Sequence, residues 1–297
     1  MSAARTLWCL PLWLSMSTWA IAACPPEGTD AASLQLLKQQ QFVLEDAGAR
    51  DVLALGLVDC LGSPDPALRD GIAFEGLTAW LRGKQLDEAT RRALRTRLYA
   101  LLDAEDTDGF QRPFAALVLS EVARTDRIES WMSAGERAAM VDKAAEYLSS
   151  VRDYRGFDDA QGWRHGVAHG SDWLMQLALN PALDRAQADR ILAAVAVQAV
   201  PESAHAYVFG EAGRLARPVL YVAQRGLLSE AEWIAWFDAL PARLGDPAKA
   251  YADEAWLARR HDLMGFLTAL HLEAVESKDP EIQALRGAVA MGIRGVP

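Results

Sequence analysis

Signals for helix starts recur along nearly the whole chain and constrain the fold more than any other feature. Ser133 and Ser229 each stand three residues before a glutamate and just ahead of an apolar periodic run, which is capping-box spacing. Asp279-Pro280 begins another such run, and proline is favoured in the first turn of a helix. Sustained period-two alternation and Asn-Gly or Asp-Gly hairpins between apolar runs are missing. The pattern predicts an all-α protein.

Periodicity predicts about twelve helices joined by short loops. Short loops make neighbouring helices antiparallel, and so many helices cannot all surround one bundle core. We therefore expect an α/α superhelix, either a HEAT-like solenoid or an α/α-toroid. No linker divides the sequence, so residues 24–297 are expected to form a single helical-repeat domain. The predicted spans are 31–43, 48–62, 66–83, 86–104, 110–126, 134–152, 163–179, 183–199, 206–226, 229–240, 250–274 and 279–292.

Residues 1–23 have the organisation of a secretory signal peptide. Arg5 provides a positive start, residues 7–19 are apolar, and Ala20-Ile21-Ala22 is a small-x-small cleavage site. The mature protein is therefore expected to be periplasmic or secreted. No later stretch reaches about 18 uninterrupted apolar residues, so no transmembrane segment is expected after cleavage.

Cys24 has more than one possible fate in an exported protein. The tetrapeptide that ends at Cys24 resembles a bacterial lipobox, which would make the chain a membrane-anchored lipoprotein. Alternatively, export leaves Cys24 and Cys60 in an oxidising compartment, where they can form a disulfide. That bridge would close a loop of about 37 residues and stabilise the fold by roughly 3–4 kcal/mol. A third possibility is that Cys60 is a buried free thiol.

Composition restricts the partners. Apolar residues make up 51% of the chain and charged residues 24%, which is typical of a packed globular protein. The net charge is −10, with lysine and arginine scattered along the sequence. These values argue against nucleic acid, or an anionic membrane surface, as the main partner.

One predicted helix, 163–179, carries a polar stripe on an otherwise apolar surface. His165, His169, Asp172 and Gln176 fall within about 60° of one another at helical spacing. Apolar residues or glycines occupy the other faces, which is typical of an inner-layer helix. We expect the stripe to face a concave side or a central cavity.

The chemistry of this stripe has several interpretations. Histidines four residues apart can bind one metal ion such as zinc, with His165 and His169 as ligands and Asp172 orienting His169. Further ligands could come from His205, Glu211, His261 or Asp262. Otherwise the stripe is a self-satisfied buried network or the floor of a metal-free ligand groove. No other cofactor is indicated.

Three further residues near the stripe are candidates for ligand binding. Trp163 and Trp173 could form walls for a sugar or an aromatic side chain, although large aromatics also fill gaps between stacked helices. Arg155 could hold an anionic ligand, or it could pair with Asp153 or Asp158. The candidate ligand-binding set is Arg155, Trp163, His165, His169, Asp172, Trp173 and Gln176.

The run Gly-Trp-x-His-x-x-Ala-His-x-x-Asp over residues 162–172, together with residues 64–80, resembles the bacterial family called domain of unknown function 2785. The resemblance extends over roughly residues 35–290 and implies an all-α, HEAT-like architecture. It implies no reaction, ligand or catalytic residue.

These observations favour an exported, non-catalytic module that binds a peptide, protein or small ligand through a concave polar site. The alternatives are a metal-dependent hydrolase that uses His165 and His169, and a structural envelope component without a ligand.

Overall fold

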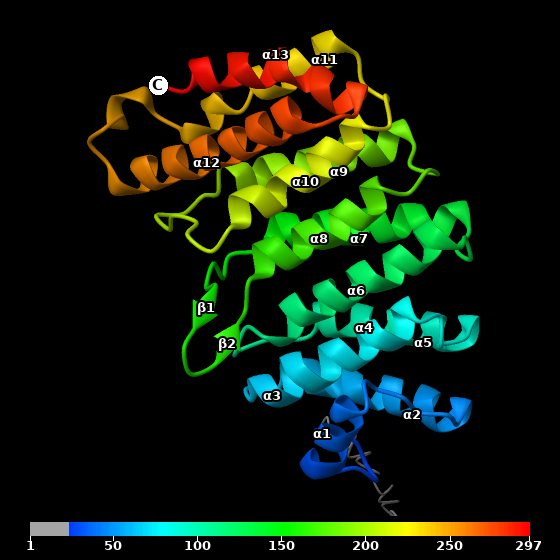
Figure 1. The fold of residues 1–297 in the computed structure, drawn as a ribbon. Helices are drawn as coiled ribbons and strands as arrows, with labels where there is room; N and C mark the ends of the chain where they lie inside the picture. The colour runs from blue at the N-terminus through cyan, green and yellow to red at the C-terminus, as the bar shows by residue number, and fades with distance from the viewer. Residues whose placement is uncertain (1–23) are drawn as a thin grey trace, which may run out of the picture.

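The computed structural model describes residues 24–297, whose regular structure is almost entirely helical (Figure 1). The expected signal peptide lies outside the described residues. A π-helical turn (Arg69–Phe74) and 3-10 turns at Val58–Gly62, Pro241–Leu244 and Pro247–Lys249 accompany the α-helices. The α-helices are α1 (Ala31–Gln39), α2 (Ala47–Leu57), α3 (Pro66–Leu68), α4 (Glu75–Arg82), α5 (Glu88–Asp103), α6 (Gln111–Ile128), α7 (Ala134–Ser150), α8 (Gly166–Ala178), α9 (Arg185–Ala199), α10 (Glu211–Ala223), α11 (Glu230–Asp238), α12 (Glu254–Glu276) and α13 (Pro280–Gly295).

Local capping explains why the helices begin where the sequence predicts. Ser133 and Ser229 both form the expected capping boxes, and each serine side chain accepts a hydrogen bond from the backbone N–H of the glutamate three residues later. Asp279 caps α13 through Glu281 and Ile282. The all-α prediction is confirmed.

The helices form two adjoining rows. Helices α4, α6, α8, α10 and α12 contact one another in that order, and α5, α7, α9, α11 and α13 pack behind them. Figure 1 shows α1 and α13 at opposite ends of the stack. The stack is therefore open, whereas the helices of an α/α-toroid form a closed ring. The HEAT-like superhelix stays a prediction. Among residues 24–297, no helix combines the length and the apolar character that crossing a membrane requires.

Helix α8 occupies the inner position that its composition predicts. It contacts α6 and α10 on either side within its row, and α7 and α9 behind. Two glycines let α7 approach closely, since a Cβ at Gly170 would lie 3.0 Å from the Tyr147 ring and one at Gly166 would lie 3.3 Å from its hydroxyl. Tyr147 donates a hydrogen bond to the Gly166 carbonyl over 3.4 Å.

The start of this helix differs from the prediction. Residues 163–165 are not helical, because β1 (Phe157–Asp158) pairs antiparallel with β2 (Gly162–Trp163) and a left-handed residue, His165 (φ 57°, ψ 40°), separates the hairpin from α8. The Arg164 and His165 N–H groups continue the pairing with Gly156 and Arg155. Two-residue strands are too short to produce an alternating sequence pattern.

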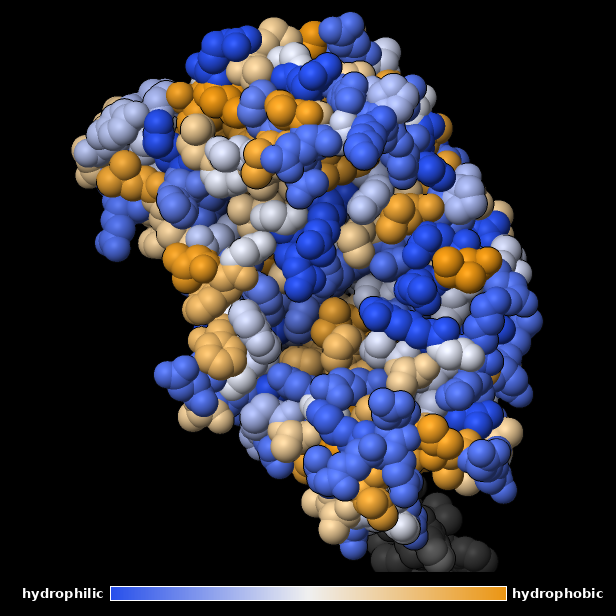
Figure 2. Space-filling model, viewed as in Figure 1, coloured by the Kyte–Doolittle hydropathy of each residue, from blue (hydrophilic) through white to orange (hydrophobic). Residues whose placement is uncertain are grey.

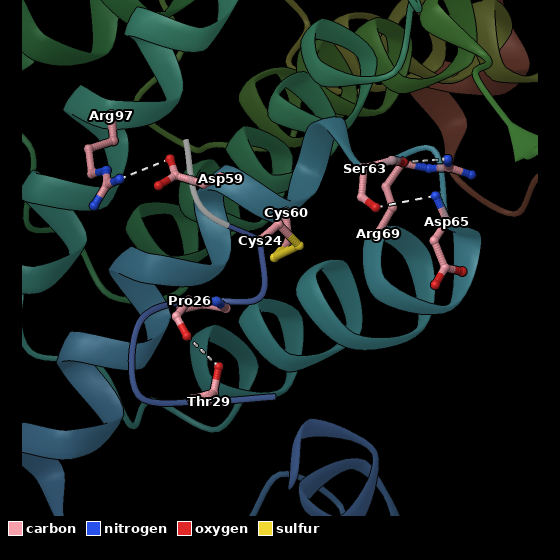
Figure 3. The surroundings of a disulfide bond; sticks show 9 residues. All are labelled: Cys24, Pro26, Thr29, Asp59, Cys60, Ser63, Asp65, Arg69 and Arg97. Atoms are coloured by element: carbon pink, nitrogen blue, oxygen red, sulfur yellow. Dashed lines mark hydrogen bonds and ion pairs between the residues drawn. A yellow bond between two sulfur atoms is a disulfide. The ribbon is translucent and has the colours of Figure 1, made fainter. Parts of the chain in front are cut away.

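Cys24 and Cys60 form the predicted disulfide, with their Cα atoms 5.0 Å apart (Figure 3). The bridge attaches the segment before α1 to the 3-10 turn that follows α2. Cys60 is fully buried, and Pro26 packs against Gly56 nearby. A sulfur atom in this bridge cannot also carry a lipid thioether.

Candidate functional site

The predicted polar stripe belongs to α8, in the middle of the inner row. Figure 2 shows one face of the molecule hollowed over α6 and α8, with hydrophobic residues inside a largely hydrophilic rim. His165, His169 and Asp172 are each only 6% exposed, so they lie beneath the surface rather than on an outer rim.

His165 is held between a tryptophan and a glutamate. The Trp163 ring stacks on the imidazole with centroids 4.8 Å apart and planes inclined by 23°. On α10, Glu211 places Oε1 3.5 Å from His165 Nε2, which has no hydrogen-bond partner within residues 24–297. Burial opposes ionisation of Glu211, but His165 and the backbone N–H groups of Glu211 and Phe209 outweigh it and lower the Glu211 pKa.

His169 lies deeper and is oriented by a backbone carbonyl. Its Nδ1 is 3.2 Å from the Pro113 oxygen, and because that oxygen only accepts, Nδ1 carries the proton. The imidazole also meets the Phe114 ring edge-on, with centroids 5.2 Å apart. Burial, followed by the charges of His165 and Arg214, lowers the His169 pKa to about 3. The hydrogen-bond partner of His169 in this structure is therefore the Pro113 carbonyl, and the expected orientation by Asp172 stays a prediction.

Asp172 instead pairs with two arginines of α10. Arg214 forms a close ion pair with Oδ2, and Arg217 Nη1 lies 4.0 Å from Oδ1. Burial raises the Asp172 pKa even though the nearby Arg214 opposes this. Oδ1 is buried and accepts no hydrogen bond from the described part of the chain.

These contacts belong to a series of polar links between successive inner helices. Arg82 of α4 binds Glu121 of α6, and Arg127 of α6 donates to Gln176 of α8 over 3.1 Å. Helical spacing in the sequence correctly grouped the polar residues of α8. The side chains that pair with them belong to other helices, so the spacing could not identify those partners.

Exposed aromatic side chains gather around Trp163, which stacks on His165. Phe157 and Trp163 come from the hairpin and Phe209 from the loop before α10, with exposures of 44%, 37% and 36%. The Trp163 centroid lies 5.1 Å from that of Phe157 and 6.1 Å from that of Phe209. We call these three residues the aromatic cluster. Gly156 makes it possible, because a Cβ there would lie 2.0 Å from the Phe209 ring.

Two predicted ligand contacts have other roles. Trp173 is fully buried and packs near Tyr99, with ring centroids 6.3 Å apart, so it fills the core rather than lining a groove. Arg155 forms an ion pair with Asp153 and donates to the Asp108 carbonyl, which is the alternative that its sequence neighbourhood suggested.

The hairpin is anchored by a buried arginine that the sequence analysis did not select. Arg69 has no exposed side-chain area and donates to the carbonyls of Ser63 and Gln161. Its guanidinium and that of Arg164 each lie 4.1 Å from the centroid of the Phe110 ring. The only sequence signal was an arginine among apolar residues near the start of a predicted helix.

The histidines and carboxylates do not form a metal centre in this structure. Across residues 24–297, no three His, Cys, Asp or Glu side chains are grouped so that they could hold an ion. Of the more distant ligands considered, Glu211 reaches His165, whereas Asp262 accepts a hydrogen bond from the Tyr207 N–H. The geometry gives no support to His165, His169 and Asp172 as joint ligands.

The neutral His169 predicts a pH effect on stability. The folded state keeps it uncharged down to about pH 3, whereas an unfolded histidine takes up a proton below about pH 6.5. The unfolded state therefore binds more protons in this window, and stability falls as the pH drops from 6.5.

His169→Asn can still donate to the Pro113 carbonyl but cannot become charged. Between pH 6.5 and 4.5, wild type should lose about 2 kcal/mol more unfolding free energy than the variant in urea titrations. If the unfolding free energies of the wild type and the variant changed equally with pH, His169 would not be a buried neutral histidine.

Comparison with known proteins places the chain in a family. A family model described as "Protein of unknown function (DUF2785)" matches residues 98–272, more than half of the chain. The chain belongs to this family, as the resemblance predicted. The matched segment includes the hairpin, α8 and the inner helices on either side of it, but not Arg69. No curated protein and no solved structure matches the chain.

Proposed function

We propose that the chain is a non-catalytic binding module that holds a peptide segment in the groove over α8. The observation that carries this proposal is the buried Asp172 Oδ1, which accepts no hydrogen bond from the described residues, beside the His165 imidazole, whose Nε2 faces the Glu211 carboxylate at 3.5 Å. Buried polar atoms are normally satisfied, so the carboxylate oxygen favours an external group or water at this point. A peptide N–H can donate to Asp172.

The aromatic cluster supports the same occupant. Exposed, grouped aromatic rings are typical of protein-binding surfaces, where they supply large contact areas. A ligand side chain of aromatic or aliphatic character would pack on Trp163, while its backbone reaches toward Asp172. Arg214 and Arg217 beside Asp172 give the groove additional donors for peptide carbonyls.

The proposed location is outside the cytoplasm, in the bacterial periplasm or secreted. The signal-like residues 1–23 and the pairing of Cys24 with Cys60 support this location, because disulfides persist in oxidising compartments. A lipid anchor on Cys24 is the competing proposal and would require the disulfide to be absent.

Replacing Trp163 tests the binding proposal. Peptides selected from a phage-displayed library on the wild-type protein should bind Trp163→Ala at least about 30-fold more weakly, because removing a central aromatic contact typically costs 2 kcal/mol or more. The matched control is Tyr251→Ala, which removes an exposed aromatic at 64% exposure outside the cluster. Circular dichroism establishes that both variants fold. Equal affinity of the selected peptides for wild type and Trp163→Ala, or a selection that enriches none, would sink the proposal.

A further inference from the structure

A second hollow lies at the other end of the inner helices. A cavity of 550 Å³ forms where the C-terminal ends of α4 and α6 meet the start of α5. We call it the basic cavity, because its lining has more cationic side chains than carboxylates. The four cations are Arg82, Lys84, Arg91 and Arg124, and the two carboxylates are Asp87 and Glu129. This positive excess occurs on a chain whose net charge is −10.

Two of the cations are already neutralised. Arg82 binds Glu121 through two hydrogen bonds of 2.5 and 2.8 Å, and Lys84 lies 2.9 Å from the Glu129 carboxylate. The Asp87 carboxylate is occupied as the N-cap of α5, where it accepts from the Thr90 N–H over 2.7 Å. The guanidinium groups of Arg91 and Arg124 take part in none of these pairs.

Arg91 and Arg124 form no ion pair with the described residues, although the Asp87 carboxylate lines the same cavity. Arg91 is nevertheless held in place, since its Nε donates to the Asp87 carbonyl and its guanidinium lies over the Trp131 ring at 5.1 Å. Arg124 forms no ion pair with residues 24–297, and its charge is one of the causes, after burial, that lower the Arg127 pKa. Both guanidinium groups therefore line one cavity without an ion-pair partner, and the lining as a whole keeps a positive excess.

Apolar side chains complete the wall. Leu81, Leu86 and Ile128 line the same cavity, and Ile128 is 50% exposed. A volume of this size is within the range of small-molecule sites, roughly 300–1,000 Å³. The lining therefore suits a molecule with an anionic head and a hydrocarbon part.

We propose that the basic cavity binds a phosphate monoester with an apolar group. A phosphate monoester carries about two negative charges at neutral pH and presents three acceptor oxygens, so it can hydrogen-bond to both guanidinium groups at once, whereas a carboxylate offers one charge and two oxygens. The phosphate oxygens accept from Arg91 and Arg124, and the apolar group lies against Leu81, Leu86 and Ile128. This site is separate from the groove over α8.

Isothermal titration calorimetry with phenyl phosphate tests the proposal. The wild-type protein should bind phenyl phosphate more tightly than inorganic phosphate or benzoate, and its affinity should fall as salt rises. Arg124→Gln should weaken binding about tenfold or more, because it removes charge-assisted hydrogen bonds. The variant should fold normally, with an unchanged melting curve in the absence of ligand, since Arg124 forms no ion pair.

Two controls make the result specific. Arg286→Gln changes an exposed arginine of α13 outside the cavity and should leave binding unchanged. Trp163→Ala should also leave phenyl phosphate binding unchanged, which separates this site from the proposed peptide groove. The proposal is overturned if phenyl phosphate produces no binding heat at millimolar concentration, if benzoate binds equally well, or if Arg124→Gln and Arg286→Gln behave alike.

Discussion

Replacing Arg69 with alanine is expected to lower the free energy of unfolding by about 3–5 kcal/mol, the range for breaking a buried ion pair by removing one partner. The side chain is fully buried, and its Nε lies 2.7 Å from Asp70 Oδ1. Burial lowers the Arg69 pKa and raises that of Asp70, so each charge depends on the other. The variant would leave the Asp70 carboxylate partly buried without its cation.

The same substitution should loosen the hairpin. Arg69 Nη2 donates to the Gln161 carbonyl over 2.7 Å, and this residue lies in the turn between β1 and β2. Without that bond, the hairpin is attached through Arg164, which binds the Asp108 carbonyl and the Gln161 side chain. Hydrogen exchange should therefore accelerate over residues 157–163 before it does so in α8.

Guanidinium chloride unfolding measures the stability change, with an exposed arginine as the control. Arg190 forms a surface ion pair with Asp142, and both side chains are more than half exposed. Arg190→Ala should cost no more than about 1 kcal/mol, as expected of surface pairs. Equal losses for the two variants would mean that the buried position of Arg69 contributes nothing beyond an ordinary surface contact.

Arg69 also shows which parts of this structure can be predicted from the sequence. Helix starts such as Ser133 were predictable because the cap and its partner lie three residues apart. Arg69 and Gln161 are 92 residues apart in the sequence, so no local pattern connects them. The long-range contact, and with it the anchored hairpin, required the fold.

The candidate site divides in the same way. Helical periodicity placed His169, Asp172 and Gln176 on one face because they share α8, whereas Arg214 and the Pro113 carbonyl come from other helices. Trp163 was wrongly assigned to this helix, since the left-handed conformation of His165 ends the helical geometry. The tryptophan nevertheless reaches the stripe by stacking from the hairpin.

Removing the disulfide is expected to have the second large effect on stability. Replacing Cys24 and Cys60 together with serine should lower the free energy of unfolding by roughly 3–4 kcal/mol, because the bridge restricts the unfolded chain by closing a long loop. The two cysteines are 36 residues apart in the sequence. Adding a reductant should destabilise the wild-type protein by a similar amount and leave the double variant unaffected, which is its internal control.

Intact mass of the protein from an exporting host decides between the bridge and the lipid anchor. A disulfide removes two hydrogens and leaves the polypeptide otherwise unmodified, whereas a lipoprotein gains the mass of its acyl chains on Cys24 and cannot form the bridge. We expect the bridged, unlipidated mass and a chain that lacks its first residues. Acylated protein would show that Cys24 anchors a lipid. Equal stability of the wild type and the double variant under oxidising conditions would show that the bridge does not stabilise the fold.

Because Cys60 is buried beside α2 and its 3-10 turn, a reduced thiol there should react slowly until the protein unfolds.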